Sequence, residues 1–356
     1  MLETLEVTTQ TGGYPITIQE GSVVNEGLTS PVYPAKVSRW VLITDEHVAT
    51  LYPRIIENLV TFKEDVIILS PGEETKTLEQ VEQVLERLAH LKLNRRDGLV
   101  ALGGGVVGDL TGFCASIYMR GIAWVQIPTT LLAQVDSSVG GKTGVNLKTG
   151  KNLAGTFYPP KEVWIDPLFL NTLPDREFWG GCSEVVKYAL IQGGVFQQWL
   201  TKIWPDISEK KPEVLATLIE KCIRCKRDIV QKDEREAGLR KTLNVGHTAG
   251  HAIEKLMKYR VTHGEALRKG MLFELSLAHR LEWIDDALHQ QLQLLVEMIP
   301  VTIEIPDFPL EDMVSAMALD KKNRENTISF LLPRQAGNIE EIELTGDELM
   351  RIMKKV

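Results

Sequence analysis

The sequence predicts an α/β fold in which a domain built on a parallel β-sheet is followed by a mainly α-helical domain. In the first half of the chain, short apolar segments rich in β-branched residues alternate with a helical pattern, which is typical of parallel strands covered by helices. From residue 174 onward, long segments of helical periodicity dominate. The 356 residues are enough for two domains of ordinary size. We therefore expect an α/β domain over residues 1–170 and a helical domain over residues 171–356, with a ligand cleft between them.

The spacing of apolar residues predicts the individual elements. Strands are expected at five apolar segments bounded by turn residues, at 37–45, 65–70, 98–103, 123–128 and 162–165. A helix is expected over 77–93, where Thr77 and Gln80 also form a capping-box pattern. In the second domain, helices are expected over 177–200, 211–232, 248–258, 265–281 and 285–298, followed by strands at 326–332 and 338–344 and a terminal helix.

The composition argues against several classes of function. The net charge of −8 does not favour nonspecific nucleic-acid binding, which needs a basic face. No apolar segment approaches the ~20 residues needed to span a bilayer, and the N-terminus lacks the basic and apolar regions of a secretion signal. We therefore expect a cytoplasmic protein without a nucleic-acid or membrane partner. Cys222 and Cys225 form a CxxC inside a helical pattern, where ordinary helix residues are a better interpretation than a redox or metal site.

A glycine-rich segment, GGGVVGD, runs from Gly103 to Asp109 after the third expected strand. Glycines allow the backbone to approach a pyrophosphate, and a following helix offers its N–H groups. The motif is weak by itself, because the usual dinucleotide fingerprint opens the first strand–helix unit. A tight turn with close helix packing is the alternative interpretation. Asp45, at the end of an earlier strand, is a candidate for binding ribose hydroxyls.

The segment 126–156 is rich in Gly, Thr, Ser, Lys and Asn, and we expect it to be a long loop. Asp136, Lys142, Lys151 and Asn152 suit sugar hydroxyls and phosphate oxygens. A solvated loop with ordinary surface charges is the alternative, but long loops inside a domain are usually functional.

Three separated residues, Glu184, His247 and His263, are candidate ligands of one metal ion. Two imidazoles and a carboxylate suit a divalent cation such as zinc, and three protein ligands leave a coordination position for substrate. His251 follows His247 by four residues, so a helix would place both on one face. In isolation that pair would suggest two ligands.

Seven segments in order carry a resemblance to a known family: GGGVVGDLTGF, IPTTLLAQVDSSVGGKTGVN, KNLAGTFYPP, SEVVKYALI, DEREAGLRKTLNVGHTAGHAIE, THGEAL and DKKN. In this order and spacing the chain closely resembles the 3-dehydroquinate synthases of the shikimate pathway. The resemblance implies a Rossmann-like nucleotide-binding domain, a helical metal-binding domain, NAD, and one divalent metal, usually zinc or alternatively cobalt. It also implies the reaction: 3-deoxy-D-arabino-heptulosonate 7-phosphate becomes 3-dehydroquinate and phosphate through transient oxidation by NAD, phosphate elimination, re-reduction and intramolecular aldol closure.

The resemblance also implies roles for the residues of this chain that match functional positions of the family. The metal ligands would be Glu184, His247 and His263. Nucleotide contacts would be Asp45, Glu73, Lys76, Gly104, Gly105, Val106, Asp109, Thr129, Thr130, Lys142 and Lys151. Catalytic groups around the substrate would be Asp136, Lys142, Lys187, Arg240, Asn244 and His251. Further substrate contacts would be Arg120, Asn152, Lys226 and one of Lys321 and Lys322.

Two roles depend entirely on the resemblance. His251 would be a substrate contact or proton carrier instead of a second metal ligand. Arg120 would reach the substrate phosphate of a neighbouring subunit, which implies a homodimer. The alternatives are another sugar-phosphate cyclase, a metal-dependent polyol dehydrogenase that releases NADH, and a non-catalytic protein that binds NAD and metal.

Overall fold

The computed structural model describes residues 2–9, 12–25, 37–318 and 327–354. Contacts between residues divide the chain into two compact units. Unit 1 comprises Met1–Leu173 and Lys210–Glu234, and unit 2 comprises Pro174–Glu209 and Arg235–Val356. Each unit is described by itself below.

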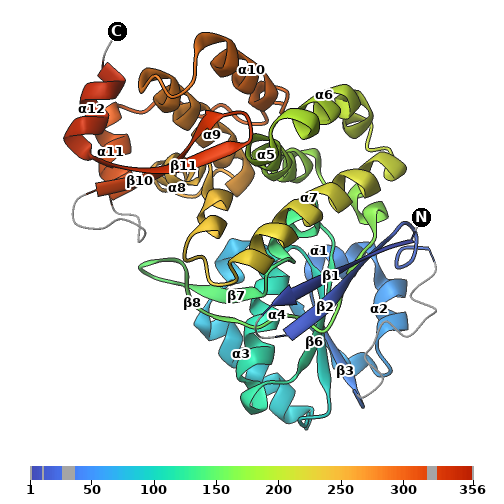
Figure 1. Cartoon of the computed structure of the whole chain (residues 1–356). Coiled ribbons are helices and arrows are strands. Elements are labelled where there is room, and N and C mark those ends of the chain that lie inside the picture. Colours follow the sequence, from blue (N-terminus) through green and yellow to red (C-terminus); the bar gives the residue numbers. More distant parts are fainter. Residues whose placement is uncertain (1, 10–11, 26–36, 319–326, 355–356) are drawn as a thin grey trace. The chain divides into compact units, whose positions relative to one another are not determined.

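Unit 1 is built on a seven-stranded sheet (Figure 1). The strand order is β1-β2-β9-β6-β5-β3-β4. Neighbouring strands are parallel throughout, except for β1, which pairs antiparallel with β2 at the edge. The bounds are β1 Leu2–Thr9, β2 Gly12–Gln19, β3 Trp40–Asp45, β4 Val66–Leu69, β5 Gly98–Gly103, β6 Ala123–Pro128 and β9 Val163–Ile165. All five predicted strands are present, whereas β1 and β2 were not predicted.

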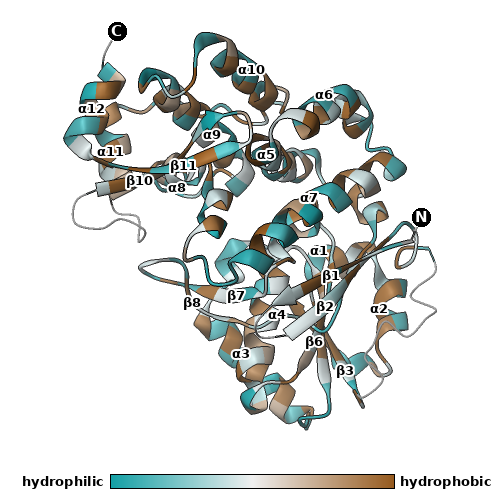
Figure 2. Ribbon diagram, viewed as in Figure 1, coloured by the Kyte–Doolittle hydropathy of each residue, from teal (hydrophilic) through white to brown (hydrophobic). Residues whose placement is uncertain are grey.

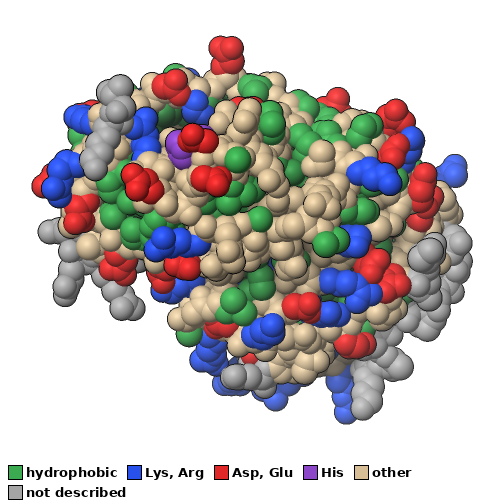
Figure 3. All heavy atoms as spheres, turned by 45° about the horizontal axis from the view of Figure 1, so that its top comes forward, with side chains coloured by type: hydrophobic (Ala, Val, Ile, Leu, Met, Phe, Trp, Pro, Cys, Tyr) green, Lys and Arg blue, Asp and Glu red, His purple; other side chains and the backbone are tan. Residues whose placement is uncertain are grey.

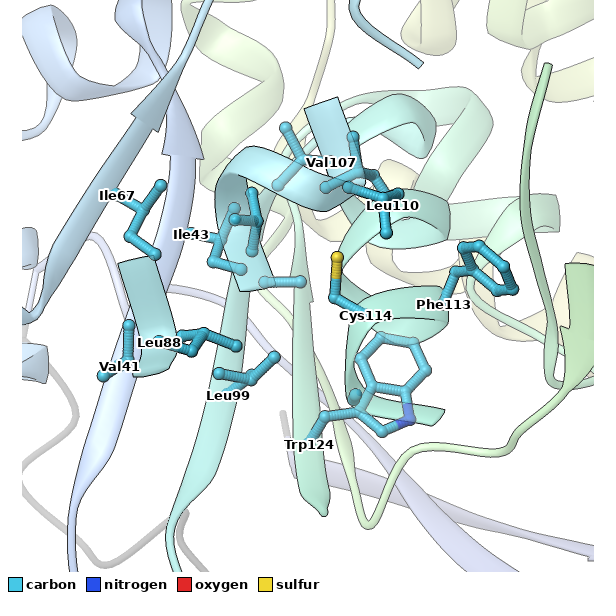
Figure 4. Packing of buried hydrophobic residues seen from close by; sticks show 14 of the residues in the cluster. Val41, Ile43, Ile67, Leu88, Leu99, Val107, Leu110, Phe113, Cys114 and Trp124 are labelled. Carbon is cyan, nitrogen blue, oxygen red and sulfur yellow. The ribbon is translucent and has the colours of Figure 1, made fainter. Parts of the chain in front are cut away.

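Alternate residues of the central strands enter two separate hydrophobic cores, because successive strand side chains point to opposite faces. Val41 and Ile43 of β3 pack with Leu99 of β5 on one face, together with side chains of α3 and α4 (Figure 4). Trp40 and Leu42 belong to the cluster on the other face, with side chains of α1 and α2. Figure 2 shows hydrophobic residues along these central strands. A sheet buried on both faces explains why its strands are nearly continuous apolar runs.

The helices of unit 1 confirm the alternating pattern. Their bounds are α1 Glu46–Leu51, α2 Pro53–Leu59, α3 Leu78–His90, α4 Gly105–Ile117 and α7 Pro212–Lys232. Thr77 Oγ1 accepts a hydrogen bond from the Gln80 amide at 3.1 Å, which is the N-cap half of the predicted capping box. Short helical turns join these elements: η1 Lys63–Asp65, η2 Glu73–Thr75, η3 Tyr118–Arg120, η4 Ala133–Ser137 and η5 Pro167–Asn171.

Helix α7 groups with unit 1, although residues 211–232 lie in the second half of the sequence. It packs against β1, β2 and η4. The domain boundary expected at residues 170/171 stays a prediction. The contact units differ from it in their first boundary, at Leu173/Pro174, and in the segment Lys210–Glu234, which groups with unit 1. Cys222 and Cys225 are buried free thiols of α7, which agrees with ordinary helix residues.

The predicted loop over 126–156 is wrong for its second half. Residues Lys142–Leu147 form β7 and Gly150–Phe157 form β8, which pair as an antiparallel hairpin. The two strands are poor in β-branched residues, so their strand propensity is weak. A Cβ atom on Gly155 would lie 2.2 Å from the carbonyl oxygen of Thr143, so this pairing needs glycine.

Unit 2 is mainly helical, as predicted. Its helices are α5 Asp175–Gln192, α6 Gly194–Ser208, α8 His247–Leu256, α9 His263–Arg280, α10 Asp286–Glu297, α11 Leu310–Ala318 and α12 Gly346–Lys354, with η6 at Leu239–Asn244. The strands β10 Thr327–Gln335 and β11 Asn338–Thr345 form an antiparallel hairpin.

The single helix predicted over 177–200 is two helices, α5 and α6, that meet at Gly193. This residue has φ 68°, which favours glycine. A Cβ atom there would lie 2.5 Å from the Gly337 amide nitrogen, so the close approach of the β10–β11 turn also requires glycine. The apolar periodicity continues across the break, and therefore it could not reveal it.

The α/β fold class is confirmed by this architecture. On the face that Figure 3 shows, acidic and basic side chains are interspersed. Among the described residues, no helix is both long enough and apolar enough to cross a membrane.

Candidate active site

The three predicted metal ligands converge in unit 2. Glu184 lies in the middle of α5, whereas His247 and His263 are the first residues of α8 and α9. Glu184 Oε1 is 3.1 Å from His263 Nε2 and 3.7 Å from His247 Nε2. The ligand atoms of the three residues all lie within 4.8 Å of one another. One divalent ion can therefore reach all three.

The electrostatics of this cluster favour a cation. Burial lowers the pKa of His263, but Glu184 and Glu254 outweigh that effect and raise the pKa to about 10. Two buried carboxylates thus hold an imidazolium at the position where a metal would bind. Because metal binding displaces this proton, a metal ion would take over the same charge balance. The donor set and its charge fit a divalent metal.

Close helix packing brings the ligands together. A Cβ atom on Gly264, next to His263, would lie 2.1 Å from the Gly180 carbonyl oxygen of α5. Ser183 Oγ donates to the Gly264 carbonyl oxygen at 2.7 Å, beside Glu184. A Cβ atom on Gly270 of α9 would lie 2.2 Å from the Gly246 carbonyl oxygen, beside His247. Glycines at these crossings set the distance between the three ligand-bearing helices.

A buried acid that was not predicted anchors the start of α8. Glu274 of α9 is 1% exposed, and its carboxylate accepts hydrogen bonds from the amides of Gly246 (2.6 Å) and Ala249 (3.2 Å). These amides flank His247 and belong to the open N-terminal end of the helix, where an anion is favourable. Glu274 therefore fixes the position of His247. Glu274 lies about three helical turns after His263, outside the sequence motifs, so the sequence contains no local signal for it.

Two other predicted residues lie within this cluster. Lys187, which is 1% exposed, forms an ion pair with Glu184 and lies 4.9 Å from the ring centre of Tyr188. His251 follows on the same face of α8, with its ring centre 5.5 Å from that of His247. Its ligand atom groups with those of Glu254 and His263 within 4.8 Å. Both open interpretations of His251, proton carrier and ligand, are compatible with this geometry.

The segment before α8 brings Arg240 and Asn244 into η6. Arg240 is 2% exposed. Asn244 Nδ2 donates to Glu236 Oε1 at 2.6 Å. Glu236 was not predicted, although it stands in the same EREAGLR stretch that supplied Arg240.

In unit 1, the glycine-rich loop joins β5 to α4 at the carboxyl edge of the sheet. Gly104 is the N-cap of α4. A Cβ atom on Gly104 would lie 3.0 Å from Thr130 Cγ2, and one on Gly105 would lie 3.1 Å from Ser137 Oγ. Val106 occupies the first turn of this helix. The Thr129 amide donates to the Gly103 carbonyl oxygen at 3.0 Å. The predicted turn residues therefore surround one helix N-terminus.

Four predicted polar residues form one network beside this loop. Lys76 Nζ donates to Asp109 Oδ2 and to Asn152 Oδ1, both at 2.6 Å. Asn146, which was not predicted, donates from Nδ2 to Glu73 Oε1 at 2.7 Å and accepts from the Asn152 amide at 2.8 Å. Burial lowers the pKa of Lys76, but Asp109 and Glu73 outweigh that effect and raise it, so Lys76 is charged.

Asp45 lies at the carboxyl end of β3 in the same unit. Its Oδ1 accepts a hydrogen bond from the Val48 amide at 2.9 Å and caps α1. Asp136 lies in η4, where its carbonyl oxygen and Oδ1 are 2.8 and 3.0 Å from Lys226 Nζ of α7. This pair joins two predicted residues 90 positions apart in the sequence.

The remaining predicted residues are more dispersed. Lys142 begins β7 and is exposed, and Lys151 lies in β8. Arg120 is exposed in η3 with φ 66°. Lys321 and Lys322 lie outside the described residues.

Comparison with known proteins agrees with this arrangement. Residues 66–180 match the N-terminal part of 3-dehydroquinate synthase, and residues 181–323 match its C-terminal part. The chain is 43% identical over 353 residues to the 3-dehydroquinate synthase of Alkaliphilus metalliredigens (strain QYMF), covering 98% of this chain and 97% of that protein. The chain belongs to the 3-dehydroquinate synthase family. The resemblance inferred from the sequence motifs is therefore confirmed.

Solved structures of related cyclases share the fold of this family member. A 2-deoxy-scyllo-inosose synthase complexed with carbaglucose-6-phosphate, NAD+ and Co2+ has a TM-score of 0.89 and 26% identity, covering 99% of this chain and all of that one. The 2-epi-5-epi-valiolone synthase of Streptomyces hygroscopicus subsp. jinggangensis 5008, with NAD+ and Zn2+ bound, has a TM-score of 0.83 and 27% identity. It covers 96% of this chain and 95% of that one.

Proposed function

We propose that this chain is a 3-dehydroquinate synthase, which converts 3-deoxy-D-arabino-heptulosonate 7-phosphate to 3-dehydroquinate and phosphate. The observation that carries the proposal is the 43% identity to a 3-dehydroquinate synthase over almost the whole of both chains. The convergence of Glu184, His247 and His263 in unit 2 supports it, because these residues would hold a divalent metal that polarises substrate hydroxyls.

The proposed cofactors are NAD and one divalent metal, zinc or cobalt. Glu184, His247 and His263 would hold the metal, which when bound acts as a Lewis acid on substrate hydroxyls. NAD would bind at the glycine-rich loop before α4 and would serve as a hydride acceptor that is regenerated within each turnover. The related cyclases with NAD+ and Co2+ or Zn2+ in their structures support this assignment.

The side chains of unit 2 have proposed tasks that follow from their chemistry. Arg240 and Asn244 would donate hydrogen bonds to anionic and hydroxyl oxygens of the substrate. Lys187 would stabilise negative charge beside Glu184, because it is buried and already paired there. His251 would hold or move a proton at a ring nitrogen, since a neutral imidazole both donates and accepts.

Unit 1 would supply the polar groups that hold the nucleotide and the rest of the substrate. Glu73, Lys76 and Asp109 form the network next to the glycine-rich loop, and we propose that they contact NAD together with Asp45, Val106, Thr129, Thr130 and Lys151. Asp136, Lys142, Asn152 and Lys226 would contact the substrate. We also propose a homodimer in which Arg120 reaches the phosphate in the partner's site.

The deciding experiment follows phosphate release from 3-deoxy-D-arabino-heptulosonate 7-phosphate in the presence of NAD and zinc, with NADH absorbance recorded at the same time. Rapid phosphate release without accumulating NADH, abolished by a chelator, is the expected result. Sedoheptulose 7-phosphate and glycerol are run in parallel. Turnover of the former instead would indicate another cyclase, and stoichiometric NADH from the latter a polyol dehydrogenase.

A further inference from the structure

The imidazole of His263 lies between two buried carboxylates. Its Nε2 is 3.1 Å from Glu184 Oε1, and its Nδ1 is 3.5 Å from Glu254 Oε1. Glu254 belongs to α8 and is 3% exposed. His247, Glu254 and the intervening His251 lie at positions i, i+7 and i+4 of α8, so one face of this helix presents all three to the cluster.

His247 shows what a ligand of this centre requires. Its Nδ1 is 3.2 Å from the Val245 carbonyl oxygen, and its Nε2 faces Glu184. A carbonyl oxygen only accepts, so Nδ1 carries the proton and Nε2 keeps its lone pair. A ligating histidine normally has its second ring nitrogen held in this way. For His263, Glu254 is the acceptor on the Nδ1 side.

We propose that Glu254 is a positioning residue for the metal centre: its carboxylate accepts the Nδ1–H of His263, fixes the tautomer, and aims Nε2 at the ion. The proposal rests on the proposed metal-dependent function. At 3.5 Å the contact is longer than a standard hydrogen bond. A small rotation of the ring would shorten it when Nε2 binds a metal in place of the Glu184 contact.

The competing interpretation is a second cation site, because His251, Glu254 and His263 also offer ligand atoms within 4.8 Å of one another. The protonation of the His263 imidazole argues against this second site. A neutral imidazole has a lone pair on one nitrogen only, so His263 cannot bind ions through both nitrogens without losing its second proton. Once Nε2 binds the metal together with Glu184 and His247, Nδ1–H remains a donor that needs an acceptor, and the Glu254 carboxylate lies on that side of the ring.

The packing around Glu254 keeps it in place. Helix α8 lies against α9 through Gly246, Gly250 and Gly270, whose close approach leaves no room for a Cβ on Gly270. The N-terminus of α8 is held by Glu274 of α9, at 2.6 Å from the Gly246 amide. Because α9 begins at His263, the helix that carries Glu254 and the helix that carries the imidazole are held against each other.

The test replaces Glu254 by glutamine, which keeps its shape and removes its charge. Zinc affinity of each purified protein is measured by competition with a chromophoric chelator, and metal content is measured at saturation. We expect Glu254→Gln to weaken zinc binding about 10- to 100-fold while keeping one ion per chain. The visible spectrum of the cobalt-loaded protein should change, because it reports the ligand geometry. The melting temperature of the metal-free protein should stay near that of the wild type.

Two further variants complete the experiment. Glu177→Gln removes the same charge from α5, two turns before Glu184, and should leave zinc affinity unchanged. Glu254→Asp keeps the charge on a shorter side chain and should retain part of the affinity, and it replaces Glu254→Gln if that variant does not fold. An unchanged zinc affinity and cobalt spectrum in the Glu254 variants would overturn the proposal.

Other outcomes have distinct meanings. Two ions per wild-type chain, reduced to one by Glu254→Gln, would overturn the positioning role in favour of a second cation site. A wild-type chain that binds no zinc would overturn the proposed metal-dependent function as well, whereas tight wild-type binding with unaffected variants overturns only the role of Glu254.

Discussion

Arg240 is a buried positively charged residue of unit 2, with only 2% of its surface exposed. Its proposed partner is an anionic group of the substrate. We expect Arg240→Ala to lower kcat/KM about 10- to 100-fold, because a hydrogen bond to a charged group contributes about 1.5–3 kcal/mol. Metal content should stay near one ion per chain. Steady-state kinetics with metal analysis checks both expectations.

The neighbouring residue provides the control for this prediction. Lys241 is partly exposed and pairs with Glu341 at 2.8 Å, so Lys241→Ala should keep near wild-type kinetics. Loss of metal from Arg240→Ala would contradict the proposal and place Arg240 among the groups that hold the metal centre.

Glu162, just before β9, makes the stability of the folded state depend on pH. Burial raises its pKa to about 7. The folded state therefore binds a proton that the unfolded state has already released, and stability falls as pH rises from the ordinary pKa of 4.5 through about 7. Glu162→Gln cannot lose this proton. It should be more stable than the wild type at about pH 8, with little difference at about pH 4.5.

Urea unfolding of both proteins at the two pH values measures this difference. The gain will be modest, because the side chain of Glu162 is only half buried and solvent screens its charge. A gain of equal size at both pH values would show that the substitution acts through packing and not through ionisation.

Individual residues also show how much of the site can be predicted from the sequence. Glu184, His247 and His263 lie in separate sequence motifs, and their donor chemistry alone indicated one metal centre. The structure brings these three side chains together. Glu254 and Glu274 carried no comparable signal. Buried acids that support other residues resemble any surface glutamate in the sequence, because burial depends on the packing of helices far apart in the chain.

Helix crossings at glycine set the geometry of the metal centre. We expect Gly264→Ala to push α9 away from α5, because the added Cβ would lie 2.1 Å from the Gly180 carbonyl oxygen. Overpacking of this kind destabilises by about 1–3 kcal/mol. Zinc affinity should fall with it, since Glu184 and His263 lie on the two displaced helices. Urea unfolding and chelator competition measure the two effects.

Gly194→Ala is the matched control, because a Cβ at Gly194 in α6 meets nothing within 4 Å. It should leave stability and zinc affinity near those of the wild type. If Gly264→Ala behaved the same way, the close approach of α5 and α9 would not be required for the centre.

Elements with strong periodicity were predicted well, and elements shaped by long-range contacts were not. The strands Gly98–Gly103 and Ala123–Pro128 have the predicted bounds, since each is a buried apolar run between turn residues. The hairpin β7–β8 was predicted as a loop because its glycines and polar residues carry no strand pattern. The break at Gly193 was missed because the glycine is required by the distant residue Gly337.

For the whole molecule, the proposed homodimer predicts that each active site contains Arg120 from the other chain. Glu184→Ala should remove the metal and activity of its own chain, and Arg120→Ala should impair the partner's site. When the two inactive variants are mixed and exchanged into mixed dimers, about a quarter of all sites should contain both an intact Glu184 and an Arg120 from the other chain. Recovery of about that fraction of wild-type activity is the expected result.

The assay must first establish that each variant alone is inactive and that subunits exchange, for example by following two differently tagged chains. No recovery despite exchange would show that Arg120 acts within its own chain or elsewhere. The proposed dimer with shared sites would then be wrong, while the activity of the wild type would be untouched.

The sequence by itself determined the fold class, most strands and helices, the family and the set of metal-binding side chains. These properties depend on local periodicity and on short motifs whose residue types carry the chemistry. The tertiary structure decided which distant residues meet: α7 joins unit 1, glycines bring α5, α8 and α9 together, and Glu254 faces His263. Such contacts depend on the three-dimensional path of the chain, and no single stretch of sequence contains them.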